Sequence, residues 1–267
     1  MRMIHHRIWM AGAVLAMASV QAQAQFGQGP ANPGPKLINL DTNWIPANNA
    51  WAIRGDIRAF GSSEKTFYGT LELTGGFQNG FGVTLRGSLA NFVSFTGTGP
   101  TIRHGGSDME AMVKYAVPQS NGLMVGAGVS LPNTPAQTHV FATGEAIYHF
   151  PTQGADLYLG GKGVFRKDST LAGISGGFDV HAAPALDVIG DLTWPVTGHN
   201  TYNTSTGALE RRAVYGVALR FTPTMQMRQS VSFDLGVTNG IGGTTGFSLT
   251  PALGNSFGVY VGATMRY

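Results

Sequence analysis

Apolar and polar residues alternate along most of the chain. From Trp51, one face of the first segment carries Trp51, Ile53 and Ile57, while Arg54 and Arg58 occupy the other face. A period of two predicts a β-strand with one apolar side. The pattern recurs in twelve segments, at residues 51–59, 67–75, 81–89, 109–117, 123–131, 140–150, 157–165, 172–180, 186–194, 213–221, 231–237 and 257–267.

None of the twelve apolar faces contains a charged residue. A charge facing lipid costs about 2 to 4 kcal/mol at the bilayer midplane, so charge-free faces are typical of strands that contact lipid. Aromatic residues stand at both ends of the faces, for example Trp51 and Phe81 at one end and Phe67 and Trp194 at the other. We therefore predict an all-β, transmembrane, antiparallel up-and-down β-barrel of twelve strands, in preference to a soluble β-sandwich.

The links between segments alternate in length. Those after the even-numbered segments are short, and the longest links, predicted as outer loops, are residues 96–107, 195–210 and 238–256. Short periplasmic turns and longer outer loops are the usual barrel arrangement, and an even strand number places both termini in the periplasm. The turn at residues 78–80 predicts a register in which Glu72 faces Arg86 and Leu73 faces Leu85.

The first fifty residues show no strand pattern. Residues 1–24 have the parts of a secretory signal peptide: basic Arg2 and Arg7, a short apolar run, and a cleavage signature at residues 22–24. Residues 25–50 are rich in Pro, Gly and Asn, and we interpret them as an irregular periplasmic N-terminal segment or a partial plug. Residues 51–267 form the predicted barrel.

Composition fits a barrel in a membrane. Charged residues make up 12% of the chain, about half the roughly 25% of soluble domains. The chain has no cysteine, which excludes disulfides and a lipid-modified N-terminal cysteine. Loss of Arg2 and Arg7 with the signal leaves the mature chain nearly neutral, so we expect no nucleic-acid partner.

Together these features resemble bacterial outer-membrane β-barrel proteins, a porin-like class. The resemblance rests on the signal end, the twelve alternating segments, and a terminal strand that closes on an aromatic residue. It implies an outer-membrane location in a Gram-negative-type bacterium, contact with outer-membrane lipid, and recognition of the last strand by the barrel assembly machinery. The residues that would carry this assembly signal are Phe257, Val259, Val261, Met265 and Tyr267.

The charges on the other face of the strands are predicted to line the lumen. These candidate pore-lining residues are Arg54, Arg58, Glu72, Arg86, Lys114, Asp179, Asp187, Asp191, Arg220, Asp234 and Arg266. A basic wall opposite an acidic patch would orient polar solutes, which favours a passive or substrate-selective channel for small solutes. If the charges instead pair and fill the lumen, the alternative is a closed structural or surface-binding barrel whose outer loops contact partners.

An outer-membrane hydrolase is the third hypothesis. Asp179 and His181 resemble the Asp-x-His pair of the omptin proteases, but they lie at the predicted periplasmic end, whereas that family works at the outer rim. We interpret them as a hydrogen-bonded pair in the lumen. His104, His139 and His199 fall on different loops without paired spacing, so we expect no metal site. We also expect no cofactor and no enzymatic activity.

Overall fold

The structure of the chain is a computed structural model. It describes residues 34–61, 65–96, 99–133, 140–165, 170–203, 205–223, 230–252 and 256–267. The predicted signal peptide, residues 1–24, and His139 lie outside the described residues. In the part of the chain that is described, no helix is long and apolar enough to cross a membrane.

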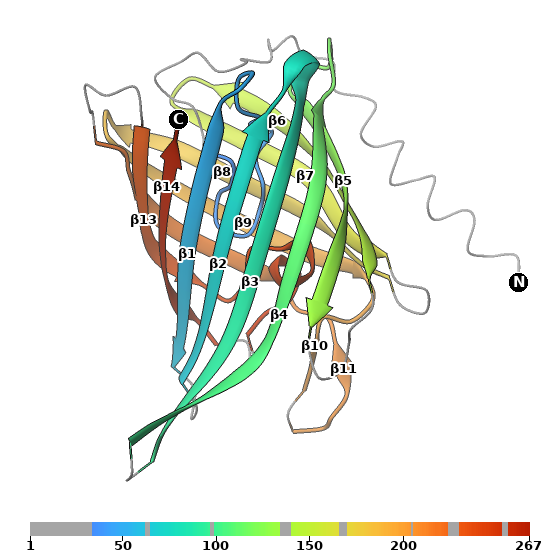
Figure 1. The fold of residues 1–267 in the computed structure, drawn as a ribbon, viewed down its shortest axis with the longest axis vertical. Helices are drawn as coiled ribbons and strands as arrows, with labels where there is room; N and C mark the ends of the chain where they lie inside the picture. The colour runs from blue at the N-terminus through green and yellow to red at the C-terminus, as the bar shows by residue number, and fades with distance from the viewer. Residues whose placement is uncertain are drawn as a thin grey trace, which may run out of the picture.

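Twelve antiparallel strands close into a barrel, as predicted (Figure 1). The ring is completed where β14 pairs with β1, with Met265 opposite Ile53 and Val261 opposite Ile57. The barrel strands are β1 (Trp51–Gly61), β2 (Lys65–Gly76), β3 (Phe81–Thr96), β4 (Gly99–Ala116), β5 (Leu123–Asn133), β6 (Phe141–Thr152), β7 (Ala155–Phe165), β8 (Leu171–Ala183), β9 (Leu186–Thr197), β12 (Val214–Phe221), β13 (Ser230–Thr238) and β14 (Gly258–Arg266).

The predicted alternation sets which side of the wall each residue faces. Ile57 and Leu71 are 59% and 63% exposed on the outer face, whereas Arg58 and Glu72 are 0% and 1% exposed inside. The predicted register is also confirmed, since Glu72 pairs with Arg86 and Leu73 with Leu85 across β2 and β3. The 3-10 turn η2 (Gln78–Gly80) joins these two strands.

Aromatic pairs stand near the two ends of the outer face. At the end that carries the C-terminus, the Phe81 and Tyr115 rings lie 4.5 Å apart, and Trp51 lies edge-on to Phe77 at 6.3 Å. Tyr215 meets Phe257 at 5.2 Å at the other end. Of the terminal-strand residues, Phe257, Val259, Val261 and Tyr267 are about half exposed and Met265 is partly buried. Their role in assembly stays a prediction.

The prediction of a long outer loop at residues 96–107 is wrong. β3 ends at Thr96 and β4 already begins at Gly99, so the two strands continue as a paired hairpin beyond the predicted segments. Backbone hydrogen bonds between neighbours can extend a ladder where no lipid selects an alternating pattern. The link at 195–210 is partly strand too: β9 runs to Thr197, and the small strands β10 (Thr201–Tyr202) and β11 (Leu209–Glu210) form a separate hairpin.

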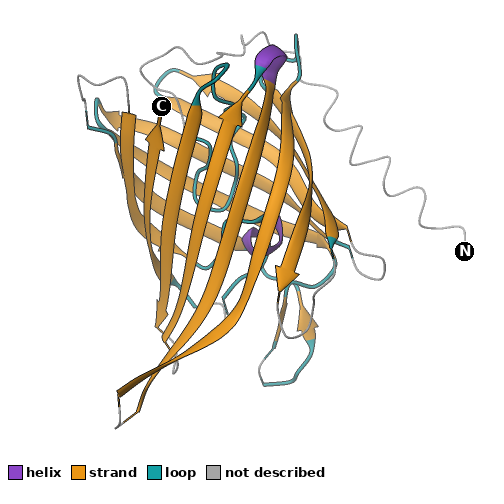
Figure 2. Cartoon of the chain, in the orientation of Figure 1, coloured by secondary structure: helices purple, strands orange, loops and turns teal. Residues whose placement is uncertain are grey.

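Two irregular segments lie inside the barrel. The first, here called the N-terminal plug, is residues 34–46, where every residue except Asn43 is buried; it is the blue coil within the barrel in Figure 1. The second, the inner loop, is residues 239–252, none of which is exposed. It carries the short helix α2 (Thr245–Ser248), drawn in the barrel interior in Figure 2. The prediction that residues 238–256 form an outer loop is therefore wrong for this described part.

Candidate functional site in the lumen

The predicted lumen charges do lie on the inner side of the wall. Nine of the eleven are buried, and Asp187 and Arg266 are partly buried. They are not separated into a basic wall and an acidic patch, because opposite charges sit side by side. Arg220 binds Asp234 at 2.8 Å, and Arg86 lies 3.0 Å from Glu72. Charges out of water are stable only when paired in this way.

Asp191 is the anchor of the N-terminal plug. Its Oδ2 accepts hydrogen bonds from the backbone nitrogens of Ile38, Asn39 and Leu40 at 2.8, 2.6 and 3.1 Å. The other oxygen, Oδ1, accepts from Asn39 Nδ2 at 2.9 Å. Three successive amides around one oxygen form a backbone nest for an anion. The carboxylate on β9 therefore fixes the turn at the tip of the plug.

Wall cations hold the carbonyl oxygens of the same turn. Four positively charged side chains of the wall each donate a hydrogen bond of 2.6 to 3.0 Å to one plug carbonyl. The pairs are Arg220 with Lys36, Arg54 with Leu37, Arg58 with Ile38, and Lys162 with Asn39. Donors from β1, β7 and β12 thus converge on four consecutive residues, and the plug is bound from several sides of the barrel.

Asp41 carries the plug's negative charge into a cluster of cations. Its Oδ2 lies 2.5 Å from Lys114 and also contacts Arg86, and its Oδ1 lies 3.1 Å from Lys36. Burial alone would raise the pKa of Asp41, but Arg86, Lys114 and Lys36 outweigh it and hold that pKa well below its usual value. Because the pKa of Asp41 is lowered in the folded protein, the ion pairs of Asp41 make their full contribution to stability above the ordinary aspartate pKa. It is lost only when the pH falls through the lowered value.

Apolar side chains complete the plug. Leu37, Ile38 and Leu40 pack with side chains of the wall, among them Met124 and Ile189. Glycines make room for them: a Cβ at Gly177 would lie 2.4 Å from Leu37 Cδ1, and one at Gly216 would lie 3.0 Å from Ile38. A larger residue at Gly177 or Gly216 would therefore require the side chain of Leu37 or Ile38 to shift.

The inner loop lies inside the barrel and contacts the plug. Lys36 of the plug donates directly to Gly243 O at 2.5 Å. Arg58 of the wall donates to Gly240 O at 2.9 Å as well as to Ile38 O of the plug, so the two segments share this donor. Thr244 binds Asp108 at 2.6 Å, and the Thr245 nitrogen donates to Glu110 at 2.9 Å. Plug, inner loop and wall thus form one buried polar network inside the barrel.

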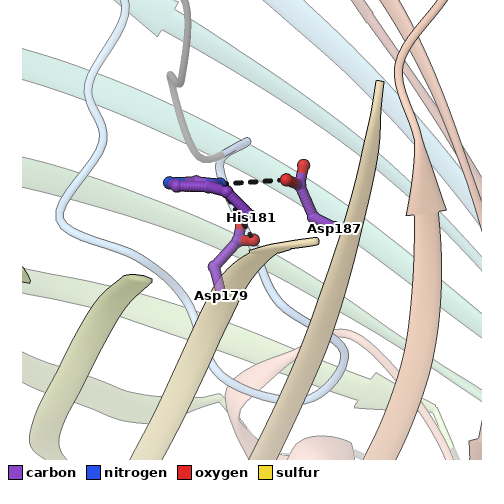
Figure 3. Close-up of side chains that lie close together, drawn as sticks. All are labelled: Asp179, His181 and Asp187. Atoms are coloured by element: carbon purple, nitrogen blue, oxygen red, sulfur yellow. Dashed lines mark hydrogen bonds and ion pairs between the residues drawn. The ribbon is translucent and has the colours of Figure 1, made fainter. Parts of the chain in front are cut away.

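A separate cluster lies at the short-turn end of β8 and β9 (Figure 3). The predicted pair Asp179 and His181 is joined there by Asp187, whose Oδ1 is 2.9 Å from His181 Nδ1. Asp156 on β7 approaches His181 Nε2 at 3.4 Å and His149 Nε2 at 2.6 Å. The pair therefore belongs to a larger group of histidines and carboxylates.

Several residues of the site were absent from the sequence prediction. Lys36, Asn39 and Asp41 lie on the segment without periodicity, for which the sequence predicts a periplasmic segment or a partial plug but no particular contacts. Lys162 and Tyr260 do have inward parity on strands with clean alternation, so the same pattern that found Arg54 could have identified them. Arg266 is partly buried, and its guanidinium lies 6.0 Å from the Trp44 ring of the plug.

Comparison with solved structures finds outer-membrane channels and porins at low sequence identity. A solved outer-membrane channel from Pseudomonas putida F1 is 13% identical, with a TM-score of 0.54 over 89% of this chain and 100% of that chain. The KdgM porin is 12% identical, with a TM-score of 0.48 over 80% and 97%. The Acinetobacter baumannii outer-membrane protein Omp33 is 12% identical, with a TM-score of 0.42 over 82% and 98%. No protein-family model and no curated protein matches the chain.

At these identities the likeness concerns the fold. The chain is a closed, twelve-stranded antiparallel β-barrel, and a solved structure that it matches with a TM-score above 0.5 is an outer-membrane channel.

Proposed function

We propose that the protein is an outer-membrane channel for small polar solutes whose passage is closed by the N-terminal plug in the state described here. The observation that carries this proposal is the way the plug is held. Its backbone amides and carbonyls bind side chains of the wall, and the chain has no cysteine that could cross-link them. Water or a polar solute can replace such hydrogen bonds, so the plug can leave the lumen without any covalent change.

The charged wall is the proposed passage once the plug has moved. Arg54, Arg58, Arg86 and Asp191 all contact plug residues, and their partners would be exchanged for water and solute. Asp187 would contribute at the periplasmic mouth, where it is partly exposed. A lumen with both signs of charge close together favours polar, hydrogen-bonding solutes over a single class of ions.

Export and orientation form part of the same proposal. Residues 1–24 would direct the chain to the periplasm, and the barrel assembly machinery would insert it into outer-membrane lipid. The C-terminus lies at the end of the barrel that carries the short turns after β2, β6 and β8, which supports a periplasmic position for that end. The N-terminal plug would then enter the barrel from the periplasm.

Removing the plug tests the channel directly. We expect the chain lacking residues 25–46 to form pores of clearly higher conductance than the full chain in planar bilayers, because the donors and acceptors that bound the plug would face water. Heat-dependent mobility in gels would confirm that the shortened barrel is folded. A folded barrel that remains silent without its plug would contradict the channel.

A folded, plug-deleted barrel without conductance would favour the second candidate function, a closed structural or surface-binding barrel. The observation behind it is the inner loop, which also has its own contacts with the barrel wall, such as Thr244 with Asp108. In this case, partners would contact the outer end, where the small β10–β11 hairpin lies. The absence of enzymatic activity also remains a proposal, and hydrolase assays of the Asp179→Ala variant would address it.

A further inference from the structure

The cluster at the periplasmic end combines ligand types that the channel does not require. Asp179 and His181 are two residues apart on β8 and both point inward, and Asp187 stands opposite His181 on β9. One ligand atom from each of the three lies within 4.8 Å of the other two. Figure 3 shows the three side chains converging on the same space. We propose that Asp179, His181 and Asp187 bind a single divalent transition-metal ion, with zinc as the best fit.

The distances suit a tetrahedral ion. Ligand atoms about 2.0 Å from a zinc ion are about 3.3 Å from one another in a tetrahedron. His181 Nδ1 lies 2.9 Å from Asp187 Oδ1 and 4.0 Å from Asp179 Oδ1, values on either side of that separation. Small rotations of the side chains would bring all three atoms into the first coordination shell, with no change in the strands.

Two buried polar atoms at the cluster point to a missing ligand. Asp179 is 1% exposed, and its Oδ1 has no hydrogen-bond partner among the described residues, while its Oδ2 lies 3.6 Å from Arg220. Tyr158 is 3% exposed, and its hydroxyl, which interacts electrostatically with Asp156 and Asp179, likewise lacks a hydrogen bond within the described chain. Buried polar atoms without partners are costly. A bound ion and its water would satisfy both.

His181 is also oriented as a metal ligand usually is. While its Nδ1 faces Asp179 and Asp187, its Nε2 lies 3.4 Å from Asp156. Metal-binding histidines commonly donate their other ring N–H to a carboxylate, which fixes the ring and strengthens the ligand. Asp156 is itself held by His149 at 2.6 Å, and the His149 ring stacks on Tyr158 with centroids 5.1 Å apart. The supporting residues are therefore already in place.

The chemistry of the donors selects the kind of ion. Calcium and magnesium prefer oxygen ligands alone, so a histidine nitrogen at the centre of the group favours zinc or a neighbouring transition metal. The side chains of His181 and Asp187 are 28% and 20% exposed, which gives an ion a path from solvent. Three protein ligands and an open side leave the fourth position to water. This inference replaces the expectation from the sequence that no metal is bound.

Zinc binding to the full-length, tag-free protein tests the proposal. After treatment with EDTA, the protein in detergent would be titrated with zinc chloride, and the stoichiometry and affinity measured by calorimetry. We expect one zinc per chain for the wild type and no binding to that site in His181→Ala or Asp187→Asn. Asp156→Asn, which removes only the supporting carboxylate, is expected to lower the affinity about 10- to 100-fold.

His199→Ala is the matched control, since that histidine is exposed near the β10–β11 hairpin and should leave zinc binding unchanged. Each variant would first be checked for heat-dependent gel mobility. If His181→Ala did not fold, the graded loss in Asp156→Asn and the visible absorption of bound Co²⁺ would still report the site. A wild type that binds no zinc, or stoichiometric binding that is unchanged in both folded His181→Ala and Asp156→Asn, would overturn the proposal.

Discussion

Replacing Asp191 with alanine is expected to speed amide hydrogen exchange at Ile38, Asn39 and Leu40 by at least about tenfold. The carboxylate accepts hydrogen bonds from all three of these backbone nitrogens. A hydrogen bond to a charged group contributes about 1.5 to 3 kcal/mol, and 1.4 kcal/mol corresponds to about a factor of ten. Loss of even one such bond would therefore populate the released plug measurably.

Exchange at these amides can be followed by mass spectrometry of the protein in detergent. Glu210→Gln is a suitable control, because Glu210 binds Asn203 and Arg212 beside the β10–β11 hairpin and has no contact with the plug among the described residues. We expect the control to match the wild type at residues 38–40. Equal exchange rates in Asp191→Ala and the wild type would mean that the nest around Asp191 does not hold the plug.

Replacing Arg86 with methionine is expected to destabilise the folded barrel by about 3 to 5 kcal/mol, the usual cost of removing one partner from a buried ion group. Arg86 is 4% exposed and contacts Glu72 and Glu110 at 3.0 Å, together with Asp41 of the plug. Without the guanidinium, three carboxylates remain buried close together. Methionine keeps much of the side-chain volume, so the change is mainly one of charge.

Unfolding of the protein in lipid vesicles by guanidinium chloride would measure this loss. Arg211→Met is the matched control: Arg211 is exposed, and its Nη1 hydrogen-bonds Val196 O at 3.2 Å, so a change within about 0.5 kcal/mol is expected. A loss in Arg86→Met no larger than in the control would show that the buried network does not depend on Arg86.

The fold was predictable because lipid imposes a strong local rule. Each strand must keep charge off its outer face, so the parity of residues such as Ile57 and Arg58 identifies both the strand and its inner side. The short turn at residues 78–80 then fixes the pairing of Glu72 with Arg86. The alternation of a strand and the short turn that follows it are both local features, so each can be recognised in a short stretch of sequence.

The plug could not be placed from the sequence, because its contacts are long-range and irregular. Asn39 and Asp191 are 152 residues apart, and the plug binds largely through backbone groups, which every residue type has. Nothing in a stretch rich in Pro, Gly and Asn specifies those partners. The same holds for the inner loop: a glycine-rich link looks like an outer loop, and the carboxylates that hold it, Asp108 and Glu110, lie on a distant strand.

The lumen charges were predictable in part: their inward direction follows from the sequence, but their partners do not. Alternation correctly placed residues such as Arg54 and Asp191 inside the barrel. Their partners depend on what fills the interior and on strands that are not neighbours in sequence. A separated basic wall and acidic patch was therefore expected where the structure has paired charges and a bound plug.

Single-channel recording with a reversible lock on the plug tests the account most directly. The chain has no cysteine, and a Cβ at Gly177 would contact the Leu37 side chain. Leu37→Cys and Gly177→Cys therefore place the only two thiols on facing positions of plug and wall, and mass spectrometry would first establish that they form a disulfide. In the Asp191→Ala background, we predict that the oxidised Leu37→Cys, Gly177→Cys protein is closed and that reduction opens it. Equal conductance in the oxidised and reduced states, whether open or closed, would contradict a channel that the plug closes.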